Sequence, residues 1–285
     1  MRVTDEAFPP VTAHGVELHG FPHRLFLAAC EQWEGMLREY TLRGLGGPQQ
    51  SYSLDELMRA GRALGLLSDA VATRGDAASA GPAPVHPPLR LDVDAPGDFA
   101  VLQGILDDAR RLSFSGELLV FPSLPEVVSL RNWLCREVVE QAAGAAPRPW
   151  TLRASAGDAA AVEVPDWDAS ILPPSDEAWL VGDDHNRIVA ASPAALTLLG
   201  WSSDLVGQRL LVVIPHHLRE AHIAGFTRSA VSGESPLLGQ PLALVALTRA
   251  GRQIPITLTL SRHSARKGRC VYVARLQPLE SAGLA

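Results

Sequence analysis

The chain has 285 residues, of which 47% are hydrophobic and 20% charged, with a net charge of −6. This length suits two domains of roughly 100–200 residues each. The acidic balance argues against a nucleic-acid-binding protein, whose surface would be basic. The sequence has no run of 18 apolar residues, so we expect no membrane span. Its N-terminus lacks the apolar core that a signal peptide requires. Cys30, Cys135 and Cys270 are far apart and have no CxxC partner, so we expect a cytoplasmic protein without disulfides.

The first half of the chain alternates strand and helix patterns. Residues 1–15 are polar and proline-bearing, and we expect them to be flexible. Apolar residues at helical spacing or in short alternating runs then predict, in chain order, a strand at 16–22, helices at 23–43 and 54–72, a strand at 89–93, a helix at 98–113, a strand at 117–121 and a helix at 123–144. Ser53 and Glu56 form a capping box at the start of the second helix. This alternation predicts a small α/β domain over residues 16–150.

The composition and the apolar periodicity change in the second half of the chain. Residues 151–174 are rich in Pro, Ala and Asp and lack sustained periodicity, which indicates a linker. Two short strands follow, joined by the polar turn "DDHN". After them come short helices, a longer helical pattern over 214–233, and three extended stretches. Those stretches cover residues 240–248, 253–262 and 270–277.

Three connected motifs in this half resemble the PAS sensor family. They are "RIVAASPAALTLLGWSSDLVGQRL" from Arg187, "VVIPHHLREAHIAGFTRSAVSGES" from Val212 and "LTRAGRQIPITLTLS" from Leu247. The resemblance that rests on them covers about residues 175–280, with residues 281–285 as a tail. The resemblance implies an α+β fold, in which a five-stranded antiparallel sheet carries helices on one face. It also implies a ligand pocket between the sheet and the helices. The residues expected to line it are Leu198, Leu211, Val213, Leu218, His222 and Phe226.

The helix at 214–233 carries three of the nine histidines, and His222 is the residue to test. In heme-binding members of the family, a histidine on this helix ligates iron, and an arginine follows six residues later. Arg228 stands at that spacing, so the resemblance also leaves open a heme site. The alternative is a packed, hydrogen-bonded histidine. His216, His217 and His222 offer no i, i+4 pair on one face, which excludes a shared metal site.

The sequence offers few motifs that are typical of other functional classes. Flavin photochemistry of the light-oxygen-voltage type is not expected, because Cys270 lies in the last strand rather than on the middle helix. Motifs of nucleotide-binding loops, serine hydrolases and zinc proteases are absent. Glu17, His19 and His23 are the one cluster that could support an enzyme in the first domain, and a strand end running into a helix explains them as well.

The leading interpretation is a bacterial cytoplasmic sensory or regulatory protein without catalysis of its own. It would detect a small ligand or the state of a partner and signal through protein contacts. We expect a homodimer formed through the PAS domain, or a complex with a signalling kinase, phosphatase or transcription factor. No nucleic-acid or membrane partner is expected. A heme gas or redox sensor built on His222 is the second hypothesis, and an enzyme in the first domain is the third.

Overall fold

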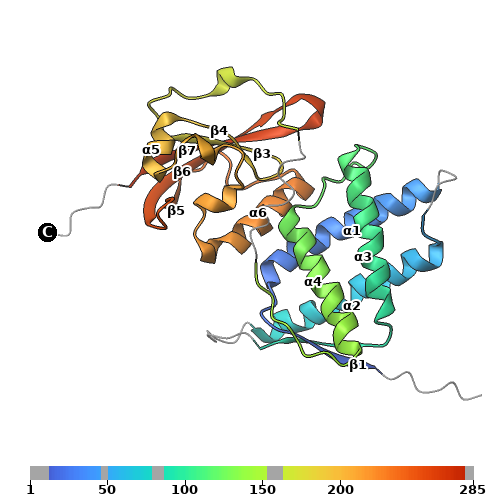
Figure 1. Ribbon diagram of the computed structural model, residues 1–285. Helices are drawn as coiled ribbons and strands as arrows, with labels where there is room; N and C mark the ends of the chain where they lie inside the picture. The colour runs from blue at the N-terminus through green and yellow to red at the C-terminus, as the bar shows by residue number, and fades with distance from the viewer. Residues whose placement is uncertain (1–12, 46–50, 79–86, 153–162, 280–285) are drawn as a thin grey trace, which may run out of the picture. The chain divides into compact units, whose positions relative to one another are not determined.

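The computed structural model describes residues 13–45, 51–78, 87–152 and 163–279. Its contacts divide the chain into two compact units (Figure 1). One comprises residues 1–123 with 127–151, and the other comprises residues 124–126 with 152–285. The expected flexible start falls mainly outside the described residues, and the expected tail at 281–285 falls wholly outside them. No described helix is long and apolar enough to cross a lipid bilayer.

The first unit contains four helices and a two-stranded antiparallel sheet within its described part. The helices are α1 (His23–Leu45), α2 (Leu54–Ala78), α3 (Gly97–Phe114) and α4 (Pro125–Ala142), and the strands are β1 (His14–Leu18) and β2 (Leu89–Val93). The predicted capping box is present, since the Glu56 carboxylate accepts bonds from the Ser53 backbone and hydroxyl at 2.8 Å each. Apolar faces of the helices bury Phe26, Trp33 and Leu102 in the core.

The strand predicted at 117–121 is wrong. Residues 117–120 form bends, and Leu119 is 96% exposed. The backbone N–H groups of Leu119 and Val120 both donate to the Glu39 carboxylate on α1, at 2.6 and 3.1 Å. A side chain therefore satisfies the donors that a strand partner would have taken.

The second unit is built on a five-stranded antiparallel sheet with the order β4-β3-β7-β6-β5. The strands are β3 (Trp179–Asp183), β4 (Ile188–Ala191), β5 (Leu242–Leu247), β6 (Gln253–Ser264) and β7 (Cys270–Pro278). The last strand pairs with the first, so β7 lies at the centre of the sheet between β3 and β6. This order, with the helices inserted between β4 and β5, is the PAS-like fold that the sequence motifs imply.

Short helices connect β4 to β5. They are α5 (Pro193–Leu199), three 3₁₀ turns η3 (Ser203–Leu205), η4 (Leu210–Val213) and η5 (His216–Leu218), and α6 (Arg219–Ser232). The Ser192 hydroxyl caps α5 by accepting from the Ala195 N–H at 3.0 Å. One face of the sheet and these helices share a core that includes Leu180, Ile188, Leu199, Leu205, Val213 and Ile256.

Residues 163–174, which the sequence assigned to a linker, pack on the opposite face of the sheet. Trp167, Ile171 and Leu172 lie against a second cluster, formed by Trp179 and Val181 of β3 and Val271 and Val273 of β7. The Asp166 carbonyl accepts from the Arg266 N–H at 2.9 Å. We call residues 163–174 the covering segment, because they cover the β3–β7 half of this outer face.

Candidate functional site

A network of charged side chains closes the turn between β3 and β4. Asp183, which is fully buried, accepts through one carboxylate oxygen from the backbone N–H groups of His185 and Arg187, at 3.0 and 2.9 Å. Its other oxygen accepts from Arg187 Nη2 at 3.0 Å and Nε at 3.2 Å. The carboxylate thus binds the turn's own backbone and one guanidinium, which fixes the turn in a single conformation.

Asp184 connects the same turn to the central strand and to the covering segment. Its carboxylate contacts His185 Nδ1 at 3.0 Å and Arg269 Nε at 3.1 Å, and it accepts from the Cys270 N–H at 3.3 Å. Arg269 in turn donates from Nη1 to the Glu163 carbonyl at 2.6 Å. Burial would raise the pKa of Asp184, but the hydrogen bonds from His185 and Arg269 outweigh it and lower that pKa to about 2.

Asn186 connects the turn to α6. It has a φ of 60°, a left-handed conformation that asparagine tolerates better than most residues, and it is fully buried. His222 Nε2 lies 2.8 Å from Asn186 Oδ1, so the imidazole donates and the amide oxygen accepts. Burial, assisted by the nearby Arg209 guanidinium, lowers the pKa of His222 to about 4. The ring is therefore neutral near pH 7, and Asn186 Nδ2 has no hydrogen-bond partner within the described structure.

Five of the six expected pocket residues fall into two groups, and the sixth, Leu218, is half-buried on η5. Leu198 and Val213 pack with the core cluster between sheet and helices, and Leu211 is also fully buried. His222 and Phe226 form an aromatic row with Tyr272 of β7, with ring centroids 6.2 and 5.6 Å apart along it. Burial, and then the neighbouring Cys270, raise the pKa of Tyr272. The expected pocket lining stays a prediction, and the aromatic row is the part of it that touches the central strand.

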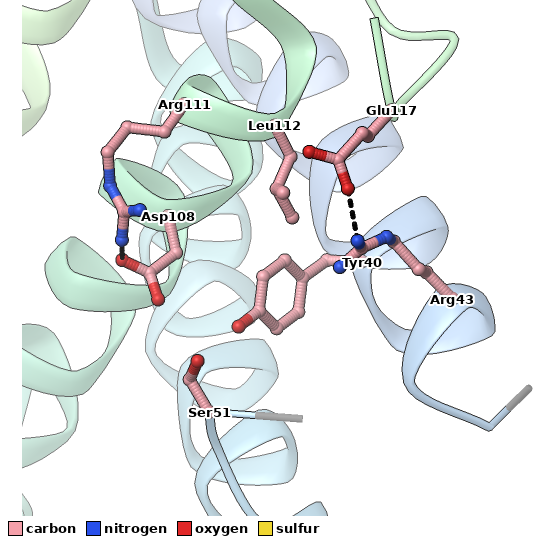
Figure 2. Close-up of a pocket in the computed structure, with 7 residues that line it drawn as sticks. All are labelled: Tyr40, Arg43, Ser51, Asp108, Arg111, Leu112 and Glu117. Atoms are coloured by element: carbon pink, nitrogen blue, oxygen red, sulfur yellow. Dashed lines mark hydrogen bonds and ion pairs between the residues drawn. The ribbon is translucent and has the colours of Figure 1, made fainter. Parts of the chain in front are cut away.

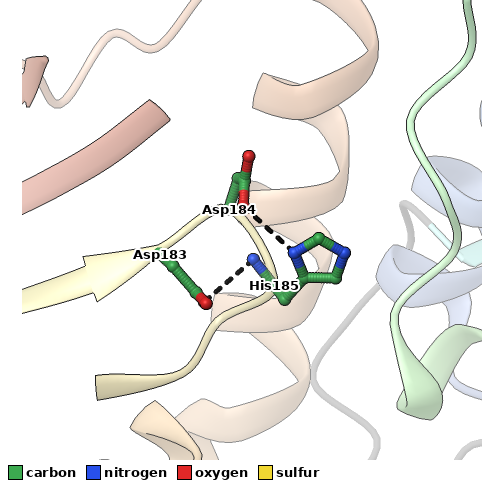
Figure 3. Close-up of side chains that lie close together, drawn as sticks. All are labelled: Asp183, Asp184 and His185. Carbon is green, nitrogen blue, oxygen red and sulfur yellow. Dashed lines mark hydrogen bonds and ion pairs between the residues drawn. The ribbon is translucent and has the colours of Figure 1, made fainter. Parts of the chain in front are cut away.

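Asp183, Asp184 and His185 place three possible metal-ligand atoms within 4.8 Å of one another (Figure 3). Both carboxylates already accept bonds from guanidinium groups, Asp183 from Arg187 and Asp184 from Arg269. A divalent cation would have to displace these two positive charges. The cluster is thus a charge-neutralised turn, and its chemistry is that of a structural connection.

The residues around His222 do not fit a heme in this conformation. Iron would be ligated by an imidazole nitrogen, and Nε2 is already 2.8 Å from Asn186 Oδ1. Arg228, the residue expected at the heme edge, is exposed to solvent. We therefore derive no step through a heme, and the heme hypothesis stays an untested prediction.

The candidate cluster in the first unit lies on its small sheet. Glu17 contacts His19 Nε2 at 3.2 Å through one oxygen and Arg90 Nε at 3.0 Å through the other. Side chains of all three residues are 38% exposed or more. His23 begins α1 on the far side of the turn that follows β1. This arrangement is an open surface ion pair, and the enzyme hypothesis gains no support from it.

Sequence reasoning found His222 but missed Asn186, its hydrogen-bond partner, and Arg269, which binds Asp184 in the same turn. Asn186 was assigned to a polar turn, and Arg269 to the loop before the last strand. The one available signal was that "DDHN" places an asparagine, which favours left-handed turns, directly before a strand. That Arg269 meets Asp184 follows only from the pairing of β3 with β7, which is a long-range contact.

The chain matches no protein-family model and no curated protein. Among solved structures, its second unit is similar to the PAS domain of the fruit-fly ELK potassium channel, with 14% identity, 39% of this chain and 93% of that one covered, and a TM-score of 0.32. It is also similar to the PAS domain of the nitrogen regulation protein NR(II) from Vibrio parahaemolyticus, with 24% identity, 39% and 95% covered, and a TM-score of 0.28.

A third similar structure is a PAS domain from a two-component sensor histidine kinase, at 12% identity, 36% and 85% covered, and a TM-score of 0.27. These likenesses are low in identity and in TM-score. The PAS-like fold of the second unit is established by its own strand order and connections.

Proposed function

We propose that this chain is a sensory or regulatory protein in which the PAS-like unit reports a change at α6 to partner proteins. The observation that carries the proposal is a series of polar contacts, joined by the backbone of the β3–β4 turn, that leads from α6 to the covering segment. It runs from His222 to Asn186, through the β3–β4 turn to Asp184, and on through Arg269 to the Glu163 carbonyl. A ligand or partner that prefers one position of α6 would thereby shift the packing of the covering segment.

The polar groups of this path support a relay rather than a catalytic site. Asp183 and Asp184 are both held by arginines, and His222 is neutral and bonded to Asn186. A general base or nucleophile needs a group that faces substrate with a matched pKa. Here the ionisable groups face one another, and we propose that the output is a change in protein contacts.

The uncovered part of the outer sheet face is the surface that we propose for a homodimer. Strand register places Ala243 and Val245 of β5 beside Thr257 and Pro255 of β6 on this face. Ala243 and Pro255 are exposed, Val245 and Thr257 are half-buried, and none of the four carries a charge. An uncharged surface of this kind suits the centre of an interface between two copies of the chain.

Size-exclusion chromatography with light scattering tests the dimer on the full chain of 30.4 kDa. We expect twice that mass at about 100 µM, in the affinity range of transient regulatory interfaces. Ala243→Arg places a charge at the proposed interface and should give the single-chain mass. The matched control Val206→Arg, at a residue 44% exposed directly after η3, should remain dimeric. A monomeric wild type, or a dimer unaffected by Ala243→Arg, would contradict the proposal.

A further inference from the structure

The first unit contains a polar cavity of about 490 Å³ between α1 and α3. Its lining residues are Tyr40, Arg43, Ser51, Asp108, Arg111, Leu112 and Glu117. This volume lies within the range of small-molecule sites. None of the residues that line the cavity belongs to the charged network of the PAS-like unit or to the Glu17 cluster.

Two arginine–carboxylate ion pairs face this cavity. Arg43 on α1 pairs with Glu117, and Arg111 pairs with Asp108 one helical turn before it on α3. Figure 2 shows the two pairs on either side of the Tyr40 ring, whose hydroxyl points toward Ser51 and Asp108. The Tyr40 ring and Leu112 supply the apolar part of the lining. Positive and negative groups therefore lie at both sides of a small apolar centre.

The cavity distinguishes between classes of ligand by charge. A simple anion would be attracted by the two arginines but repelled by the two carboxylates. A simple cation would be attracted by the carboxylates but repelled by the arginines. A molecule with a carboxylate at one end and an ammonium group at the other can satisfy both sides. The arginine side chains of the pairs Arg43–Glu117 and Arg111–Asp108 are 39% and 72% exposed to solvent, so these pairs contribute little by themselves and can exchange partners at little cost.

We propose that this cavity binds a free α-amino acid. Asp108 is the less exposed carboxylate, at 20%, and with the hydroxyls of Tyr40 and Ser51 it forms the ammonium-binding end. Arg43 forms the carboxylate-binding end, since a guanidinium can hold a carboxylate with two parallel bonds. The amino acid's side chain lies against Leu112 and the Tyr40 ring. This site lies in a different unit from the proposed relay and does not depend on it.

Isothermal titration of the full chain tests the proposal, with each of the common L-amino acids as the probe and with acetate and methylamine as half-ligands. We expect at least one amino acid to bind one-to-one below about 10 mM, and both half-ligands to bind at least about tenfold more weakly. Asp108→Asn and Arg43→Gln should each weaken the amino acid about tenfold or more. The control Arg90→Gln removes a comparable surface ion pair on β2 and should leave binding unchanged.

Three outcomes would overturn the proposal. They are an absence of saturable binding by any amino acid, binding that both Asp108→Asn and Arg43→Gln leave intact, and acetate or methylamine binding as tightly as the amino acid. Circular dichroism and thermal melting of each variant show whether it folds. If Asp108→Asn does not fold, Arg43→Gln decides, because the Arg43 side chain is 39% exposed and its pair is not part of the core.

Discussion

At the scale of single residues, two titratable groups of the β3–β4 region are displaced from their ordinary pKa for different reasons. Asp184 is stabilised as a carboxylate by hydrogen bonds from His185 and Arg269, against the effect of burial. His222 is stabilised as the neutral ring because it is buried and lies near the Arg209 guanidinium. Both displacements connect the stability of the fold to pH, in windows that can be separated.

Asp184→Asn is expected to lower the free energy of unfolding by about 2 kcal/mol at pH 7, because the pKa of this carboxyl falls from 3.8 to about 2 on folding. A folded pKa below the unfolded value gives stability that is present above pH 4 and lost as pH falls toward 2. Urea unfolding of wild type and variant at several pH values measures this. The difference should shrink with acid, whereas the exposed control Asp204→Asn should show little difference at pH 7. A difference that stays constant down to pH 2.5 would contradict the pairing.

His222 also loses its contribution to stability on acidification, but in a higher pH window than Asp184. Its folded pKa of about 4 lies below the ordinary 6.5, so the unfolded chain takes up the proton first and stability falls as pH drops from 6.5 to 4. His222→Gln keeps a donor for Asn186 but does not titrate. Between pH 7 and pH 4.5, we expect the wild type to lose about 2 kcal/mol more than this variant. His217→Gln, on the exposed η5 turn, serves as the control, and equal losses in all three proteins would refute the buried neutral histidine.

At the scale of secondary-structure elements, the sequence predicted what depends on local periodicity. The ranges of α1, β2, α3 and the five strands of the PAS-like sheet agree with the patterns of apolar residues to within a few positions. The sequence-based prediction failed where a contact with a residue distant in the chain determines the local structure. Residues 117–121 have a strand's composition, but Glu39 takes two of their backbone donors. Residues 163–174 have a linker's composition, but Trp167 and Leu172 find an apolar sheet face.

Packing between α3 and the residues that precede α2 depends on one glycine. A Cβ at Gly104 would lie 2.4 Å from the Tyr52 hydroxyl oxygen, which is a severe clash. We expect Gly104→Ala to lower the free energy of unfolding by about 1–3 kcal/mol. Gly65→Ala on α2, where nothing lies within 4 Å, should instead raise it by about 0.5–1 kcal/mol.

Adding Tyr52→Phe to Gly104→Ala tests the cause of that effect, because it removes the clashing oxygen and leaves the ring. Thermal or urea unfolding of the three variants measures the result. The double variant should recover most of the lost stability. Failure to recover any of it would show that the hydroxyl is not what Gly104 accommodates.

The covering segment is expected to depend on Trp167. Its half-buried ring packs against Trp179, Val181, Val271 and Val273, so Trp167→Ala should lower the free energy of unfolding by about 1–2 kcal/mol. It should also speed proteolytic cleavage within residues 163–174. Val164→Ala, at a residue 53% exposed, is the matched control and should change neither. Equal cleavage of wild type and Trp167→Ala would contradict the packing of this segment on the sheet.

At the scale of the whole molecule, the chain combines a helical unit that contains a small polar cavity with a PAS-like unit that contains a polar path through its sheet. The architecture of the second unit was accessible from sequence because three motifs in order imply it. The path was accessible only in part. His222 stood out as a histidine on the expected helix, but its partner Asn186 lies 36 residues away. Arg269 binds Asp184 from 85 residues away, and only the folded sheet brings these two together.

Hydrogen–deuterium exchange on the full chain tests the central claim most directly, by comparing wild type, His222→Ala and Arg228→Ala. His222→Ala removes the contact of α6 with Asn186, and Arg228→Ala changes an exposed residue of the same helix. If the path transmits the state of α6, His222→Ala should speed amide exchange in residues 163–174 as well as in the β3–β4 turn, while Arg228→Ala should leave both unchanged. Faster exchange confined to α6 and the turn, with residues 163–174 unaltered, would contradict the account.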